Sequence, residues 1–148
     1  MKSILQFIMA FAFAALTTSS DAQSPASGVT LIASNRVVAA LTKGMPLLEN
    51  SAFKVHASRR DAPGIAEIHT RDTDIIHVLE GSATLVTGGT AIEPKTIAPE
   101  EIRGKEIQGG ESCRISKGDV IVIPNGVPHW FKQVDAPLLY YVVKVTAK

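Results

Sequence analysis

Short segments of alternating apolar and polar residues occupy most of the chain after residue 52. In residues 53–60, Phe53, Val55 and Ala57 fall on one side of an extended strand. Further strands are predicted at 65–69, 74–79, 82–86, 102–108, 112–115, 120–123, from 129 onward and at 138–145. Closely spaced short strands with glycine-containing turns are typical of an all-β sandwich or barrel.

Four segments depart from this alternation. Residues 31–44 have apolar residues near helical spacing and end in Lys43-Gly44, so we expect a short helix over one opening or flank of the β domain. Residues 46–51 are expected to form a connector, and residues 90–101 a solvated polar loop. The segment Val120–Ile123 is apolar on both sides, which predicts burial between two layers or at a homodimer interface.

The N-terminal 22 residues have a composition of their own. Lys2 precedes the apolar run Ile4–Leu16, and small residues follow at 20–22, which is the layout of a secretory signal peptide. The run is too short to span a bilayer, although a retained anchor or a buried helix is the alternative. We expect a signal peptide over 1–22, a leader with a short helix over 23–52 and an all-β domain over 53–148. The processed protein is then periplasmic or secreted, with no membrane attachment.

Charge and cysteine content narrow the classes of partner. The chain of 148 residues has 15 Lys and Arg against 14 Asp and Glu, a net charge of +1, so no basic surface for nucleic acid is expected. Cys113 has no second cysteine with which to form a disulfide. We expect it to be a buried thiol.

The chemistry concentrates in residues 66–81. Glu67 and His69 are two residues apart, so their side chains leave the same face of a strand. A polar turn over 70–73 would place His69 and Asp74 opposite one another in a hairpin, with Cβ atoms about 5 Å apart. The turn-rich segment 124–128 brings His129 to the start of another strand. Two imidazoles and two carboxylates suit one divalent ion: Fe, Mn, Ni or Zn.

These residues resemble the two sequence motifs of the cupin superfamily. The second motif, G-x5-P-x-G-x2-H-x3-N, is matched at Gly118, Pro124, Gly126 and His129, with Gln133 at the Asn position. The first, G-x5-H-x-H-x3,4-E-x6-G, is matched in part: His69 is retained, whereas Glu67, Asp74 and Asp61 stand where the motif has His, Glu and the opening Gly.

The resemblance covers residues 53–145 and implies a double-stranded β-helix, also called a jelly roll. It also implies one divalent metal held by His69, Asp74, His129 and Glu67, and it favours a homodimer. Because one fold supports many activities, oxygenase, isomerase and lyase chemistry all stay open. We expect a metal-dependent enzyme acting on a small polar organic molecule.

Alternatives exist for the function and for individual residues. A non-catalytic cupin that binds a sugar or an organic acid is the main alternative, and a structural domain that has lost its metal is a third. Glu67 is also a candidate catalytic base with a raised pKa, or a solvent-facing residue if the strand register shifts by one. His77 is expected on the outer face. Candidates for the wall of a substrate pocket are His56, Arg59 and Phe131.

Overall fold

Residues 28–148 are the part of the chain that the computed structural model describes. The predicted signal peptide, residues 1–22, and residues 23–27 of the predicted leader lie outside this part. Ile32–Lys148 form one unit, which contains one helix, α1 (Ser34–Lys43). Its strands are β1 (Met45–Glu49), β2 (Phe53–Arg60), β3 (Ala66–His69), β4 (Asp72–Thr87), β5 (Thr90–Ala91), β6 (Lys95–Ala98), β7 (Glu101–Gly104), β8 (Ile107–Gln108), β9 (Glu111–Ser116), β10 (Val120–Ile123) and β11 (His129–Thr146).

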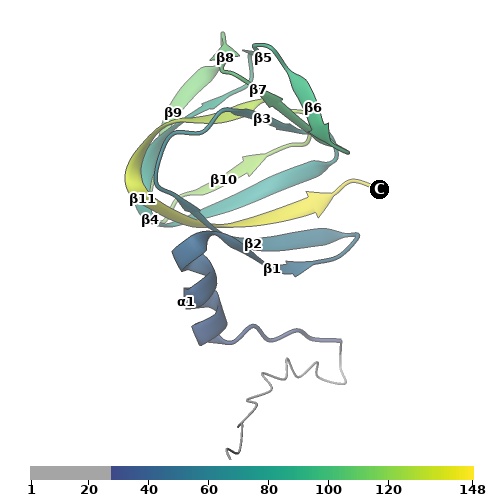
Figure 1. The fold of residues 1–148 in the computed structure, drawn as a ribbon, viewed down its shortest axis with the longest axis vertical. Helices are drawn as coiled ribbons and strands as arrows, with labels where there is room; N and C mark the ends of the chain where they lie inside the picture. Colours follow the sequence, from purple (N-terminus) through teal and green to yellow (C-terminus); the bar gives the residue numbers. More distant parts are fainter. Residues whose placement is uncertain (1–27) are drawn as a thin grey trace, which may run out of the picture. The chain divides into compact units, whose positions relative to one another are not determined.

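The strands form a sheet that curls back on itself (Figure 1). Its order is β1-β2-β11-β3-β7-β6, while β4 pairs with β9, β10 and β11; β5 and β8 form a separate small ladder. Strand β11 is therefore shared, since it pairs with β2, β3 and β4. This is the jelly-roll arrangement that the sequence predicts.

The helix α1 lies against β1 and β2, below them in Figure 1. Its buried Ala40 packs with Leu47 and Ala57. The helix ends as predicted, because Gly44 has a φ of 70° and donates its N–H to the carbonyl oxygen of Ala40 at 2.9 Å. The expected helix on one flank of the β domain is confirmed.

Strand β4 is one long strand where two were predicted. Before Gly81 it pairs with β10, and after Gly81 it pairs with β9. Gly81 has a φ of 79°, and a Cβ there would lie 2.4 Å from the carbonyl oxygen of Pro137. Only glycine fits such a close approach, so this residue lets the strand pass between two partners without ending.

The predicted hairpin between His69 and Asp74 is wrong. Strand β3 pairs with β7 and β11, and β4 continues into a ladder with β10 and β11. Thr70 donates its N–H to the carbonyl oxygen of Glu100, so the chain turns a corner there between two ladders. A short polar segment fits a corner as well as a hairpin turn.

Two segments predicted to lack regular structure contain strands. Residues 46–49 of the expected connector belong to β1, which pairs with β2. Residues 90–101 contain β5 and β6, and they lead into β7. The ends of the main sheet are formed by β1 and β6, and edge strands tolerate proline and polar residues because one side of their backbone faces solvent.

Burial differs from expectation at two places. Val120 and Val122 of β10 are 63 % and 59 % exposed, so β10 is not buried on both faces within one chain. Cys113 on β9 is exposed, so the predicted burial of this thiol is wrong. His77 is exposed on the outer face, as predicted.

The inner face of β4 changes character along its length. Val78 and Ile76 belong to the main apolar core, together with Leu85, Phe131 and Leu138. Two and four residues before Ile76, the same face carries the buried carboxylates Asp74 and Asp72. The core therefore fills one end of the curled sheet, and a polar cavity occupies the other.

Candidate metal centre

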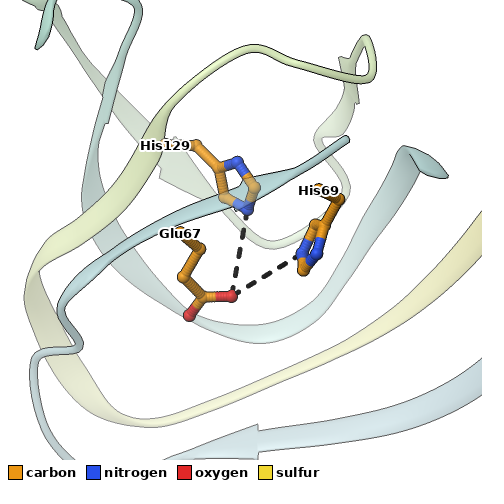
Figure 2. A group of neighbouring side chains, drawn as sticks. All are labelled: Glu67, His69 and His129. Carbon is orange, nitrogen blue, oxygen red and sulfur yellow. Dashed lines mark ion pairs between the residues drawn. The ribbon is translucent and has the colours of Figure 1, made fainter. Parts of the chain in front are cut away.

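Three ligand-type side chains converge inside the curl, from two neighbouring strands. Strand β3 supplies Glu67 and His69, and β11 supplies His129, which is the register partner of Glu67. Both imidazole rings point toward the carboxylate of Glu67 (Figure 2). Nε2 of each histidine lies 3.9 Å from Oε2 of Glu67, and one ligand atom from each of the three residues lies within 4.8 Å of the others.

His69 has a buried Nε2 atom with no hydrogen-bond partner among the described residues. A buried polar nitrogen without a partner costs free energy unless something else contacts it. Glu67 Oε2 and Asp74 Oδ2, at 3.9 and 3.6 Å, are too far away to accept a hydrogen bond from it. The atom therefore faces a space that a cation can fill.

Both histidines are held in the form that binds metals. Burial lowers the pKa of His129, and burial together with the nearby charge of Lys144 lowers that of His69. Neutral imidazoles carry the lone pair that a metal needs. Nδ1 of His129 lies 3.2 Å from the carbonyl oxygen of Val127, and donation of its proton there leaves Nε2 as the free acceptor.

Glu67 is clamped by two arginines. Arg60 Nη2 lies 2.7 Å from Oε1, and Arg103 Nη1 lies 2.5 Å from Oε2. Burial of Glu67 opposes its ionisation, but the two guanidinium charges outweigh burial and lower its pKa to about 2. The raised pKa expected for a catalytic base at Glu67 is therefore wrong. A permanently ionised, fixed carboxylate suits a metal ligand instead.

Asp74 lies beside this group, but its carboxylate is already engaged. Its Oδ2 is 3.6 Å from Nε2 of His69. Lys144 Nζ donates hydrogen bonds to both carboxylate oxygens at 2.7 Å. Asp74 is thus close enough to be the fourth ligand expected from the sequence, and Lys144 holds it away from that role in this conformation.

The group opens into a cavity of about 380 Å³. His56 and Phe131 line it, as expected for a pocket wall, whereas Arg59 does not. Side chains alternate along β2, so the neighbouring Arg60 enters the cavity, where its guanidinium lies 4.3 Å from the centre of the Phe131 ring. The charged residues around the cavity are Glu49, Lys54, Arg60, Glu67, Asp72, Asp74, Glu100, Glu101, Arg103 and Lys144.

Sequence reasoning missed the cations that surround the ligands. Lys144 could have been found, because it continues the inward face of β11 two residues after the buried Val142. Arg103 could not, because its contact with Glu67 depends on the register between β3 and β7, in which the two residues are partners.

The donor set fits a divalent ion. Two imidazoles and one carboxylate, with coordination positions left open, are typical ligands of Fe(II) and also suit Zn, Mn and Ni. Ligand atoms on adjacent positions of an octahedral ion are about 3 Å apart. The observed separations of 3.9 Å from Glu67 Oε2 need only a small inward movement of side chains.

A curled jelly-roll sheet with a histidine and carboxylate cluster inside it defines a class of protein, and comparison with known sequences agrees. The sequence model of the cupin family matches residues 22–148. The chain belongs to the cupin family.

Solved structures share the fold at low sequence identity. A Bacillus halodurans protein has a TM-score of 0.57 and 15 % identity, covering 82 % of this chain and 86 % of that one. KdgF from Halomonas sp. has a TM-score of 0.51 and 17 % identity (71 % and 80 %). Hydroquinone 1,2-dioxygenase from Sphingomonas sp. TTNP3, solved with 4-hydroxybenzoate bound, has a TM-score of 0.52 and 9 % identity (72 % and 66 %). These likenesses establish the fold alone.

Three further findings concern the coverage of one matching structure, the curated proteins and membrane-spanning helices. The chain spans about half, 51 %, of the matching Peruvianin-I structure from Thevetia peruviana. No curated protein matches the chain. Within residues 28–148, no helix combines the length and the apolar character needed to cross a membrane.

Proposed function

We propose that this cupin is a metal-dependent enzyme that acts on a small polar organic molecule. In this proposal His69, His129 and Glu67 hold one divalent ion inside the jelly roll. The observation that carries the proposal is the buried Nε2 of His69, which lacks a hydrogen-bond partner among the described residues and faces the same space as His129 and Glu67. A structure normally pairs such an atom, so a metal is the natural partner.

Each residue around the ion has a defined task. Arg60 and Arg103 fix the carboxylate of Glu67, and the contact between His129 and the carbonyl oxygen of Val127 fixes the ring orientation. A bound divalent ion would polarise a substrate oxygen or activate water or dioxygen. The cavity of about 380 Å³ leaves room for a small organic molecule beside the cluster.

Metal analysis tests this proposal directly. Purified protein is stripped with a chelator, reloaded separately with Fe(II), Mn(II), Ni(II) and Zn(II), and assayed for bound metal. We expect one ion per chain with at least one metal, and loss of binding in His69→Ala and His129→Ala. His77→Ala is the matched control, because His77 is exposed on the outer face. Stoichiometry near zero for all four ions would refute the proposal.

A second candidate function is a cupin that binds a sugar or an organic acid without turnover. One observation favours it: the carboxylates of Glu67 and Asp74 already have arginine and lysine partners, so their charge is balanced without a metal. A ligand that raises the melting temperature and is recovered unchanged after long incubation with metal-loaded protein would support this candidate.

Location and assembly are part of the same proposal. The N-terminal composition supports export, and mass spectrometry of protein recovered outside the cytoplasm should show a chain that begins at Gln23. The exposed Val120 and Val122 on β10 support a homodimer, since large apolar side chains on an outer sheet face favour a protein partner.

A further inference from the structure

A second hollow, of about 370 Å³, adjoins the cavity of the metal centre. Strand β1 pairs with β2 only from Ala57 backward, so residues 58–60 of β2 extend beyond that ladder. The hollow lies at this extension, against the start of β1 and the end of α1. It shares with the first cavity the residues His56, Ser58, Arg60, Glu67, Arg103 and Tyr140.

The two spaces differ in charge. The hollow is lined by the cations Lys43, Arg59, Arg60 and Arg103 against one carboxylate, Glu67. The cavity of the metal centre has four cations but six carboxylates. The combined space is thus positive at the end near α1 and negative at the other, which favours ligands that carry a negative charge at one end.

The arginines that line the hollow differ in the carboxylate partners that they already have. Arg60 and Arg103 both hold Glu67. Arg59 is held by Asp61, through contacts of 2.8 and 2.7 Å, and the side chain of Asp61 is 61 % exposed. An exposed pair of this kind is weak, so an incoming anion can compete with Asp61 for Arg59.

We propose that the small molecule bound by this protein is a carboxylate, with its anionic group seated in the hollow between Lys43 and Arg59. The rest of the molecule then extends past Arg60 and Tyr140 toward His69 and His129. That direction rests on the proposed metal centre, whereas binding of the anion does not. Guanidinium groups suit carboxylates because the planar fork donates two parallel hydrogen bonds.

The experiment compares acids with their neutral amides. Calorimetric titrations of full-length protein use succinate against succinamide and 4-hydroxybenzoate against 4-hydroxybenzamide, with inorganic phosphate as a separate anion. We expect at least one acid to bind about tenfold or more tightly than its amide, in metal-free and in zinc-loaded protein. Its affinity should fall with rising salt. Phosphate binding as tight as the best acid would overturn the assignment to carboxylates.

Variants locate the anion. Lys43→Gln and Arg59→Gln should each weaken binding of the preferred acid roughly three- to tenfold, and Asp61→Asn should strengthen it because Arg59 is released. Lys117→Gln, in an exposed turn before β10, is the matched control. Equal affinities for acid and amide, or full affinity in both Lys43→Gln and Arg59→Gln, would refute the inference.

Metal content measured on the same samples separates this inference from the proposed function. Acid binding that is sensitive to Lys43 and Arg59 in protein that takes up no metal would sustain the inference and refute the metal centre. Binding of one ion per chain, with equal affinity for acids and amides, would support the metal centre and refute this inference. Acid binding that requires the metal and ignores both cations would place the anion on the ion, which contradicts the inference.

Discussion

Lys144 donates hydrogen bonds to both carboxylate oxygens of Asp74 at 2.7 Å, although the two residues are 70 positions apart in the chain. They are brought together as register partners in the β4–β11 ladder. Asp74 occupies the position at which the cupin motif has a glutamate ligand. The aspartate side chain is shorter than that of glutamate by one methylene. With Asp74 engaged by the lysine, the proposed ligand set is His69, His129 and Glu67.

Replacement of Lys144 should release Asp74. In metal-free Lys144→Met we expect a loss of roughly 3–5 kcal/mol in unfolding free energy, because a buried carboxylate loses its partner. Added metal should then raise the melting temperature more than in wild type, since Asp74 becomes free to bind the ion.

Lys54→Met is the matched control for this prediction. Lys54 pairs with Asp72 at 2.6 Å in the same cavity, without an ionic contact to the histidines. Its loss should lower stability while the response to metal stays that of wild type. The same metal-induced shift in Lys144→Met and wild type would contradict a role for Lys144 in holding Asp74.

The arginine clamp should control metal affinity. Arg60→Gln and Arg103→Gln each remove one of the two charges that lower the pKa of Glu67. We expect a 10- to 100-fold weaker metal affinity, the range typical for loss of a partner that orients a ligand. The loss should grow as pH falls, because Glu67 then protonates more easily. Arg114→Gln is the control, because Arg114 pairs with the exposed Asp135. This variant should bind metal as wild type does at every pH.

Acid should destabilise the metal-free protein in two stages. The folded state lowers the pKa of His69 and His129 below 6.5, so the unfolded chain binds their protons first and stability falls as pH drops below about 6.5. Glu67 has a pKa of about 2 in the folded state against 4.5, so a further loss, on the order of 3 kcal/mol, spans pH 4.5 to 2.

Denaturant titrations between pH 8 and pH 2 measure both stages. Glu67→Gln should reduce the lower stage, to which Asp72 also contributes because its pKa is lowered in the folded state, and the upper stage should remain. The exposed Glu111→Gln should leave both stages unchanged. Stability that stays constant from pH 7 to 5 would contradict the burial of neutral histidines.

Gly81 should be much harder to replace than Gly118, another glycine with a positive φ. Gly81→Ala puts a Cβ 2.4 Å from the carbonyl oxygen of Pro137, so backbone must move, and we expect a loss of about 3 kcal/mol or more. Gly118 has a φ of 94°, but a Cβ at this residue would have no atom within 4 Å, so Gly118→Ala should cost only about 1–2 kcal/mol. Equal losses in thermal unfolding would refute the close-approach argument.

The outer face of β10 should determine the oligomeric state. Val122→Lys places a charge among exposed apolar side chains, and we expect it to convert a dimer into a monomer with an unchanged far-UV spectrum. Lys117→Gln serves as the control. Sedimentation that gives a monomer for wild type at micromolar concentration would refute the proposed homodimer.

Local sequence patterns correctly predicted the elements whose structure depends mainly on residues that are close in the sequence. Strand β2 and the end of α1 agree with residues 53–60 and 43–44, because alternation and the Lys-Gly ending are local signals. The shared face of Glu67 and His69 is equally local. Their approach to His129 was predicted from motif spacing, which encodes the fold of a whole family.

Contacts between distant strands escaped prediction. The pairs Glu67–Arg103 and Asp74–Lys144 depend on the registers of two ladders that no short segment determines. The raised pKa expected for Glu67 failed for that reason, since burial was foreseen and the two arginines were not. The hairpin at 70–73 failed because a polar tetrapeptide does not specify whether the next strand pairs with the preceding one.

The shared position of β11 has a consequence for how the protein folds during synthesis. A nascent chain that ends before His129 lacks the partner of β2, β3 and β4, so three strands expose unsatisfied backbone groups and apolar side chains. Such an intermediate is prone to aggregation, and the candidate metal ligands come together only after its last strand is made. We therefore expect folding to follow completion of the chain, with help from a chaperone until then.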